Sequence, residues 1–182
     1  MEARRHVPWT IEESKPIYRN PFIEVVEDRV VRPDGRPGIY GTVAMKPGVA
    51  VLPVDEDGLA YLTREFRYAI GRESIEVAGG GIDDGESPRE AARREAREEL
   101  GVEASEWIDL GTIDPFTAVV HSPAHLFLAR GLSFSPTERD GTEVMETLKV
   151  PFDEAVRLVM DGTITHGPSC VLILKAARIM GR

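Results

Sequence analysis

Cysteine is almost absent from this chain of 182 residues, which contains only Cys170. A single thiol excludes an intrachain disulfide, and it also excludes the clusters of cysteine ligands that hold structural zinc ions. The apolar residues around it, SCVLILKAA, predict a buried and unreactive thiol rather than a nucleophile. No stretch of the sequence approaches the roughly 20 apolar residues that a membrane-spanning helix needs. The basic residues near the N-terminus are followed by no apolar segment, so we expect a cytoplasmic protein.

Positive charge is also scarce, because 22 basic residues stand against 31 acidic residues and the formal net charge is −9. Nucleic acids and anionic membranes bind through basic surfaces, so neither is expected as the main partner. Anionic small molecules are compatible with this charge, since a bound divalent cation can reverse the sign of an acidic site. The hydrophobic fraction of 42% is ordinary for a globular domain, so disorder is not predicted.

Alternating and apolar segments predict more strands than helices. Strands are expected at residues 22–32, 38–46, 49–54, 60–66, 74–78, 107–113, 124–130 and 142–150, and helices at 88–100, 152–160 and 168–180. The turn DEDG predicts that 49–54 and 60–66 form a hairpin. Prolines exclude a long helix in residues 1–20, which we interpret as a packed arm. This order favours a mixed α/β (α+β) sandwich over a regular alternation of strand and helix.

The helix expected at 88–100 has well-defined signals at both ends. Ser87 and Glu90 have the spacing of a capping box, and Pro88 suits the first helical position. Gly101 suits the left-handed conformation that ends many helices. The segment just before the helix contains three glycines at 79–81, where the backbone must turn or approach another group closely.

One face of this helix is predicted to be acidic. At 100° per residue, Glu95, Glu98 and Glu99 share an arc of about 100°, beside a narrow apolar stripe. Glu95 and Glu99 repel each other at the i, i+4 spacing, and a cation would remove that repulsion. Mg²⁺ takes such oxygen ligands together with waters and substrate phosphates. A solvated acidic face is the alternative, and the helix alone leaves both interpretations open.

The glycines and the helix together carry a longer pattern, G-x₅-E-x₇-R-E-U-x-E-E-x-G-U, where U is apolar. The matching residues are Gly80, Glu86, Arg94, Glu95, Ala96, Glu98, Glu99, Gly101 and Val102. This pattern resembles that of the Nudix hydrolase family. Ala96 is smaller than the aliphatic residue usual at its position.

The resemblance implies a fold, an activity and roles for individual residues. The fold is a Nudix-like α/β/α sandwich with a mixed sheet, preceded by N-terminal antiparallel strands. The activity is hydrolysis of the diphosphate linkage in a nucleoside diphosphate joined to another group, with Mg²⁺ or alternatively Mn²⁺. The implied metal ligands are the Gly79 carbonyl, Glu86, Glu95, Glu98 and Glu99. Glu98 also contributes to catalysis as a base, and Arg94 orients the glutamates through salt bridges.

The stretch REFRYAIGRESIEVAGGGI further resembles the ADP-ribose and nucleoside diphosphate sugar pyrophosphatases. In that comparison Arg67 and Glu76 contact the substrate and Arg64 assists, while Ala78 stands where those relatives often have proline. The products would be a nucleoside monophosphate and a sugar phosphate. Dinucleoside polyphosphates, coenzyme A derivatives and noncanonical nucleotides are alternative substrates, and a sensor without turnover is a further alternative.

The catalytic base and the assembly are less directly indicated. The segment ERDGTEVMETLKV offers Glu143 as the base, with Glu146 as the second choice. His121 and His125 are interpreted as structural or surface residues, and a contact of His121 with substrate is the second interpretation. The resemblance also implies that residues 1–45 form an N-terminal arm with strands that supports a homodimer, and that 46–182 form the Nudix hydrolase domain.

Overall fold

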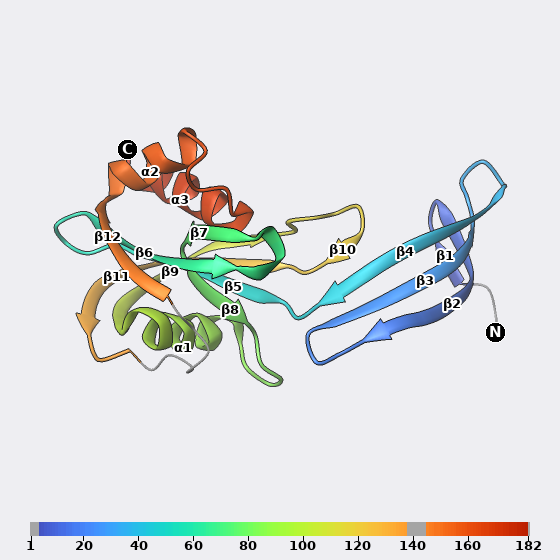
Figure 1. Ribbon diagram of the computed structural model, residues 1–182, viewed down its shortest axis with the longest axis horizontal. Helices are drawn as coiled ribbons and strands as arrows, with labels where there is room; N and C mark the ends of the chain where they lie inside the picture. Colours follow the sequence, from blue (N-terminus) through green and yellow to red (C-terminus); the bar gives the residue numbers. More distant parts are fainter. Residues whose placement is uncertain (1–3, 138–144, 182) are drawn as a thin grey trace. The chain divides into compact units, whose positions relative to one another are not determined.

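The computed structural model describes residues 4–137 and 145–181, and the chain divides into two compact units (Figure 1). The first unit comprises Met1–Lys46 and Asp114–Ser122, and the second comprises Pro47–Ile113 and Pro123–Arg182. The excursion of 114–122 into the first unit has no signal in the sequence. No helix in the described part of the chain is long and apolar enough to cross a membrane.

The first unit is a single five-stranded sheet with the order β1-β2-β3-β4-β10. Its strands are β1 (Arg4–His6), β2 (Trp9–Arg19), β3 (Ile23–Val31), β4 (Pro37–Met45) and β10 (Val120–His121). The first four are antiparallel neighbours, and β10 runs parallel to β4. The arm expected at residues 1–20 is thus non-helical but consists largely of paired strand. Pro16, which lacks a backbone N–H, stands where the pairing of β2 with β3 shifts register.

The second unit contains two sheets and all three α-helices of the described residues. One sheet has the order β8-β5-β11-β9 and the other β12-β6-β7. The strands are β5 (Gly48–Pro53), β6 (Leu59–Arg67), β7 (Arg72–Glu76), β8 (Ala78–Gly81), β9 (Val102–Ile113), β11 (Ala124–Phe134) and β12 (Met145–Pro151). The helices are α1 (Pro88–Leu100), α2 (Phe152–Met160) and α3 (Gly167–Ile179). A short 3₁₀ turn, Tyr68–Ile70, closes the β6–β7 hairpin.

Helices cover both sides of these strands, which gives the expected α/β/α sandwich (Figure 1). Successive residues of β5 point to opposite sides: Leu52 belongs to a core cluster with residues of α2 and α3, and Val51 to a cluster with residues of α1. Both side chains are 0% exposed. Burial on both faces explains why β5 is continuously apolar rather than alternating.

The expected hairpin of 49–54 with 60–66 is wrong. β5 and β6 belong to different sheets, and the two sides of the turn are joined by the isolated bridge between Val54 and Ala60 and by the Asp55 N–H, which donates to the Leu59 carbonyl at 3.0 Å. β5 pairs instead with β11 in parallel and with β8 antiparallel. The reason is physical: a strand that is apolar on both faces gains most from a central position, where neighbours and helices cover it.

Two further strand boundaries differ from the sequence prediction. The segment 74–78 is divided between β7 and β8, and the glycines continue β8 as a strand instead of turning. The strand expected at 142–150 lies partly outside the described residues, and β12 is described from Met145.

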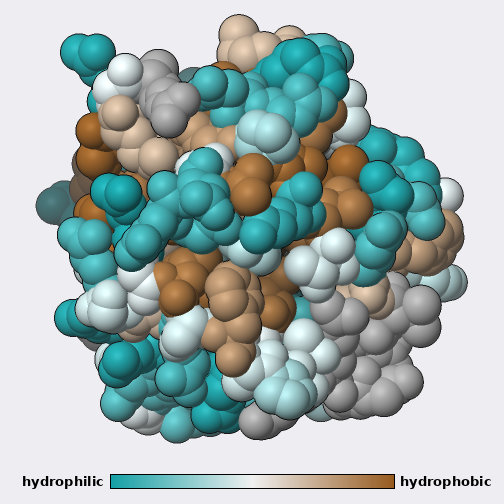
Figure 2. All heavy atoms as spheres, turned by 90° about the vertical axis from the view of Figure 1, so that its left-hand side faces the viewer, coloured by the Kyte–Doolittle hydropathy of each residue, from teal (hydrophilic) through white to brown (hydrophobic). Residues whose placement is uncertain are grey.

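In Figure 2, hydrophobic residues are visible between hydrophilic ones on the face shown. Folded proteins retain much apolar surface, so such single residues need no partner.

Candidate active site on the α1 glutamates

Helix α1 is held at both ends by the groups that the sequence predicts. The Ser87 side chain accepts a hydrogen bond from the Glu90 backbone N–H, and Glu90 Oε2 accepts one from the Ser87 N–H at 2.8 Å. Gly101 ends the helix with a φ of 65°. Ala92 and Ala96 are 0% exposed and pack in the core with residues of β5 and β8. These short side chains let α1 approach β8 closely.

Two glycines of β8 permit close approaches, one to a glutamate of α1 and one to the backbone of β5. A Cβ atom on Gly80 would lie 2.6 Å from Cδ of Glu95, so only glycine leaves space for that carboxylate. A Cβ on Gly79 would overlap the backbone carbonyl of Val49 in β5. The Gly79 N–H donates to Glu99 Oε2 at 3.2 Å. The glycines therefore serve close approaches, of Gly80 to a carboxylate and of Gly79 to the β5 backbone, which is one of the two roles that the sequence left open.

Arg94 gathers three glutamates and one carbonyl around its guanidinium. Nε and Nη2 donate to the two oxygens of Glu86, each at 3.0 Å. Nη1 donates to Glu95 Oε1 at 2.6 Å and to Glu98 Oε2 at 3.2 Å, and Nη2 also reaches the Gly81 carbonyl at 2.9 Å. The rigid fork of arginine donors suits this arrangement, since lysine has a single nitrogen.

The charges in this cluster stabilise one another. Hydrogen bonds from Arg94 lower the pKa of Glu86, and hydrogen bonds to Glu86 and Glu95 raise the pKa of Arg94 further against the effect of burial. Glu95 is 9% exposed and Glu99 is 6% exposed. The alternative of a solvated acidic face is therefore wrong for these two residues.

A second cluster lies on the β6–β7 hairpin. Arg67 donates through Nε to Glu76 Oε1 at 3.1 Å and through Nη2 to Oε2 at 2.6 Å, which is a bidentate ion pair. Glu65 Oε1 lies 2.5 Å from the same Nη2. Burial opposes the charge on Glu76, but Arg67, His166 and Ser74 together outweigh it and lower its pKa.

The two clusters share one electrostatic environment. Burial tends to lower the pKa of Arg67, but the hydrogen bond to Glu76 and the charges of Glu76, Glu65 and Glu99 raise it overall. Glu99 belongs to α1, so its carboxylate lies close enough to act on a cation of β6. The structure therefore places Arg67 within electrostatic reach of Glu99.

Arg64 does not join Arg67. Alternation along β6 places these two side chains on opposite faces of the strand, since the register with β7 and β12 has no shift. Arg64 instead pairs across the sheet with Glu146 of β12, at 3.2 Å between Nη1 and Oε2. Glu143, the first choice for the catalytic base, lies outside the described residues.

The two histidines singled out by their spacing lie in different units. His121 is an exposed residue of β10 in the first unit. His125 belongs to β11 in the second unit, where its Nδ1 lies 3.1 Å from Thr112 Oγ1. Among the described interactions, His125 has no contact with the α1 glutamates of its own unit.

Comparison with known families identifies the second unit. Residues 44–168 match the model described as the NUDIX domain. The chain belongs to the NUDIX domain family. Residues 9–43 match the model described as the nucleoside diphosphate sugar hydrolase N-terminal domain. The resemblance inferred from the glycines and glutamates is thus confirmed.

Individual NUDIX relatives cover most of the chain. A CMP-5'-(N-acetyl-N-hydroxy-3-aminopropyl)phosphonate hydrolase from Streptomyces rubellomurinus is 31% identical over 167 residues, which are 91% of this chain and 81% of that protein. An ADP-ribose pyrophosphatase from Bacillus subtilis is 28% identical over 145 residues, covering 79% of this chain and 78% of that protein. The crystal structure of an ADP compounds hydrolase superposes with a TM-score of 0.82 over 95% of this chain and 94% of that one, at 23% identity. That last likeness confirms the fold.

The donor set of this NUDIX site fits a hard divalent cation, because carboxylate oxygens are ligands that Mg²⁺ prefers. Within residues 4–137 and 145–181, however, no group of three or more His, Cys, Asp or Glu side chains is already arranged to hold a metal ion. Arg94 binds oxygens of Glu86, Glu95 and Glu98 instead. The metal-ligand roles of these residues, of Glu99 and of Gly79 therefore stay predictions.

Three neighbours of the site were missed by sequence reasoning. Glu65 has a usable signal, because it lies two residues before Arg67 and so shares its face of the strand. The Gly81 carbonyl, which Arg94 reaches, has none. His166 contacts Glu76 from far along the chain and likewise has no local signal.

We expect Arg94→Gln to lower the free energy of unfolding by about 2 kcal/mol at pH 7, and by less at pH 3. The pKa of Glu86 is lower in the folded state, so the stabilisation is present above the ordinary glutamate pKa and lost as the pH falls through the lowered value. Urea unfolding at both pH values measures this. Arg93→Gln, an exposed change on the same helix, should cost less than about 0.5 kcal/mol. An equal loss for Arg94→Gln at both pH values would contradict the role of its ion pairs.

Proposed function

We propose that this protein hydrolyses the diphosphate linkage of ADP-ribose or a related nucleoside diphosphate sugar, giving a nucleoside monophosphate and a sugar phosphate. The observation that carries the proposal is the set of α1 glutamates held by Arg94 against the glycines of β8. The match of residues 9–43 to a nucleoside diphosphate sugar hydrolase N-terminal domain supports this class of substrate. The pyrophosphatase names of several relatives point the same way.

Mg²⁺ is the proposed cofactor, with Mn²⁺ as an alternative. The proposed ligands are Glu86, Glu95, Glu98, Glu99 and the carbonyl of Gly79. A divalent cation bound there would neutralise the charge of the diphosphate and make a water molecule a better nucleophile. Arg94 sets the directions of the glutamate oxygens, and Glu98, half-buried at the edge of the cluster, contributes to proton transfer.

Arg67 and Glu76 are the proposed substrate-binding residues. The Arg67 side chain is 41% exposed although its inner edge is fixed by Glu76 and Glu65, so part of the guanidinium remains open to an anionic group. Glu76, only 5% exposed at its side chain, orients Arg67. We propose Arg64 as a weaker contributor to binding, because its pairing with Glu146 is exposed to solvent and easily exchanged.

The relative from Streptomyces gives a specific second candidate. Its name describes a hydrolase of a CMP-linked phosphonate, and it covers 91% of this chain. A phosphonate joined to a nucleotide presents an anionic phosphorus group much like that of a nucleoside diphosphate sugar, so the same residues would bind it. A sensor without turnover is disfavoured, because Glu95, Glu98 and Glu99 are all retained.

Assembly and location complete the proposal. We propose a cytoplasmic homodimer in which residues 1–45 form the dimerising arm, and residues 46–182 the catalytic domain. The exposed apolar side chains of Ile17, Tyr18 and Phe22 in or beside β2 support an association through this arm. No nucleic acid or membrane is proposed as a partner, given the net charge of −9.

A hydrolysis screen tests the activity and its metal site together. ADP-ribose, nucleotide sugars, a CMP-linked phosphonate, dinucleoside polyphosphates and nucleotides are each incubated with and without Mg²⁺. We expect cleavage only with the metal, and a loss of more than about 100-fold in kcat for Glu95→Gln and Glu99→Gln, because even outer partners of metal ligands cost about 10- to 100-fold. Glu103→Gln, an exposed change just beyond α1, is the matched control. Full activity of the Glu95 and Glu99 variants would refute the site.

A separate comparison tests the catalytic base. We expect Glu143→Gln to lower kcat by about 10²- to 10⁴-fold while KM changes little, as for loss of a general base. Glu146→Gln, which removes the partner of Arg64, should leave kcat nearly unchanged and affect KM at most. Steady-state kinetics on the best substrate of the screen measures both. Full turnover in the Glu143 variant would move the base to another residue.

A further inference from the structure

The start of α3 reaches across to the substrate-binding pair of the hairpin. His166, the residue before α3, places Nδ1 at 3.3 Å from Glu76 Oε2. The same nitrogen lies 2.8 Å from the hydroxyl oxygen of Ser169, in the first turn of the helix. Ser169 is 0% exposed and Glu76 is 4% exposed. The imidazole is therefore fixed between a buried hydroxyl and a buried carboxylate.

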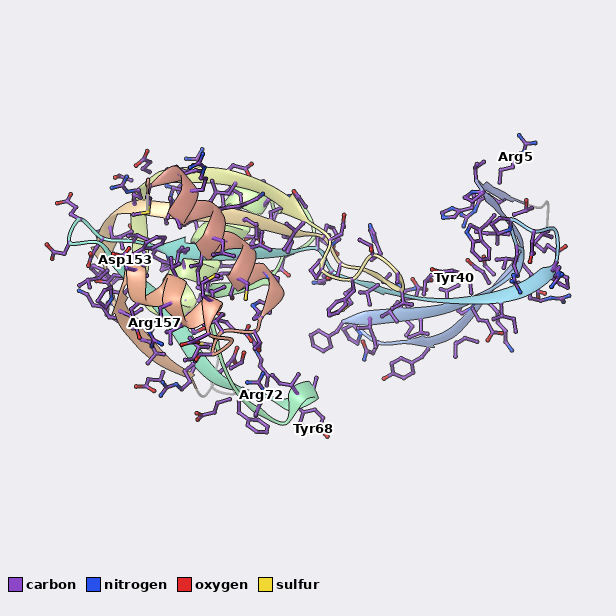
Figure 3. All side chains as sticks on the ribbon, turned by 90° about the horizontal axis from the view of Figure 1, so that it is seen from above. Arg5, Tyr40, Tyr68, Arg72, Asp153 and Arg157 are labelled. Carbon is purple, nitrogen blue, oxygen red and sulfur yellow. The ribbon has the colours of Figure 1, made fainter. Side chains whose placement is uncertain are left out.

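The backbone of the same strand segment is tied to α3 as well. The N–H of Val77, the residue after Glu76, donates to Ser169 Oγ at 2.9 Å. Nη2 of Arg72, at the start of β7, donates to Thr165 Oγ1 at 2.8 Å. Figure 3 shows Arg72 and Tyr68 on the hairpin formed by β6 and β7. Three contacts, from Arg72, Glu76 and Val77, thus hold β7 and the residue after it against residues 165–169.

The protonation of the His166 ring determines how it interacts with Glu76. Burial lowers the pKa of His166, although the charge of Glu76 opposes this, so the ring is neutral at pH 7. We assign the ring proton to Nδ1, because a bare nitrogen there would turn its lone pair toward the Glu76 carboxylate. The single N–H of the neutral imidazole then lies between Ser169 Oγ, the shorter contact at 2.8 Å, and Glu76 Oε2 at 3.3 Å, and it adds no second positive charge beside Arg67.

Arg67 contacts a second carboxylate besides Glu76, so the contact between His166 and Glu76 affects the orientation of the guanidinium. Its Nη2 lies 2.6 Å from Glu76 Oε2 and 2.5 Å from Glu65 Oε1, so the two N–H groups of this nitrogen face one carboxylate each. The side chain of Glu65 is 15% exposed, against 5% for Glu76. A Glu76 free to rotate would lose the second of its two hydrogen bonds and let the guanidinium turn toward Glu65. The contact of His166 with Glu76, added to the hydrogen bonds from Arg67 and Ser74, opposes that rotation.

We propose that His166 is a positioning residue, which holds the Arg67–Glu76 ion pair in the orientation that binds the anionic part of the substrate. The proposal rests on the proposed function in one respect, namely that Arg67 binds substrate. His166 acts through Glu76, and α3 thereby sets the geometry of a site that otherwise belongs to β6, β7 and α1. Ser169 holds the imidazole in place.

Two substitutions at His166 separate the effect of losing the N–H donor from the effect of changing the side-chain volume. His166→Leu keeps apolar volume and removes the donor, whereas His166→Asn keeps an N–H close to the position of Nδ1. For the best substrate of the screen, we expect KM to rise about tenfold in His166→Leu, as for one hydrogen bond to a charged group, while kcat changes less than about twofold. His166→Asn should stay within about threefold of the wild-type KM. His125→Leu, which removes another histidine with a hydroxyl partner, is the matched control and should not change KM.

A second readout needs no substrate, so it remains informative even where the proposed function fails. The Arg67 Nε–H donates to Glu76 and should give a side-chain NMR signal that exchanges slowly with water, assigned by its loss in Arg67→Lys. We expect fast exchange in His166→Leu and slow exchange in His166→Asn. Were His166→Leu unable to fold, Ser169→Ala should show the same faster exchange.

The outcomes are decisive in both directions. Fast Arg67 exchange and raised KM in His166→Leu, both restored in His166→Asn, support the proposal. Unchanged Arg67 exchange in folded His166→Leu overturns it, whatever the activity. A lower melting temperature with wild-type KM and wild-type exchange would assign His166 a purely structural role and also overturn it. Absence of hydrolysis in the wild type, with the NMR result as expected, would count against the proposed function alone.

Discussion

The hydrogen bonds of Arg94 are the interaction on which the candidate site depends. One guanidinium binds Glu86, Glu95, Glu98 and the carbonyl of Gly81. It thereby joins the end of β8, the loop before α1 and α1 itself into one charged cluster. Carboxylates packed this closely would repel one another without a cation among them. Arg94 supplies that cation permanently, and its planar donors also fix the direction of each oxygen. The acidic helix is thus a stable part of the fold rather than a strained one.

Close packing of small residues positions the charged cluster around Arg94. Ala92 and Ala96 bring α1 against the sheet, and Gly80 leaves room for the Glu95 carboxylate beside the backbone of β8. Glu99 of the same helix acts electrostatically on Arg67, so an acidic and a basic group face a common region. The proposed function accounts in this way for a diphosphate substrate of a protein with a net charge of −9: the acidic residues would attract a divalent cation, and Arg67 would bind the anion directly.

Local patterns predicted the helix and its glutamates well, because caps, glycines and charge spacing act within a few residues. The capping box at Ser87, the end at Gly101 and the grouping around Arg94 all follow from such spacing. Long-range pairing was not predictable in the same way. The central position of β5 depends on β8 and β11, which pair with it from distant parts of the sequence, and the contact of His166 with Glu76 joins residues far apart. Nothing local encodes such partners.

Binding of Mn²⁺, followed by electron paramagnetic resonance, tests the central claim most directly, namely that the α1 glutamates bind a divalent cation together with a diphosphate. The titration is made on wild type and Glu99→Gln, with and without an ADP-ribose analogue whose bridging oxygen is replaced by a methylene group. The account predicts that the analogue tightens Mn²⁺ binding to the wild type by about tenfold or more, and that Glu99→Gln loses both the binding and the coupling. Equal Mn²⁺ binding by both proteins, unaffected by the analogue, would contradict it.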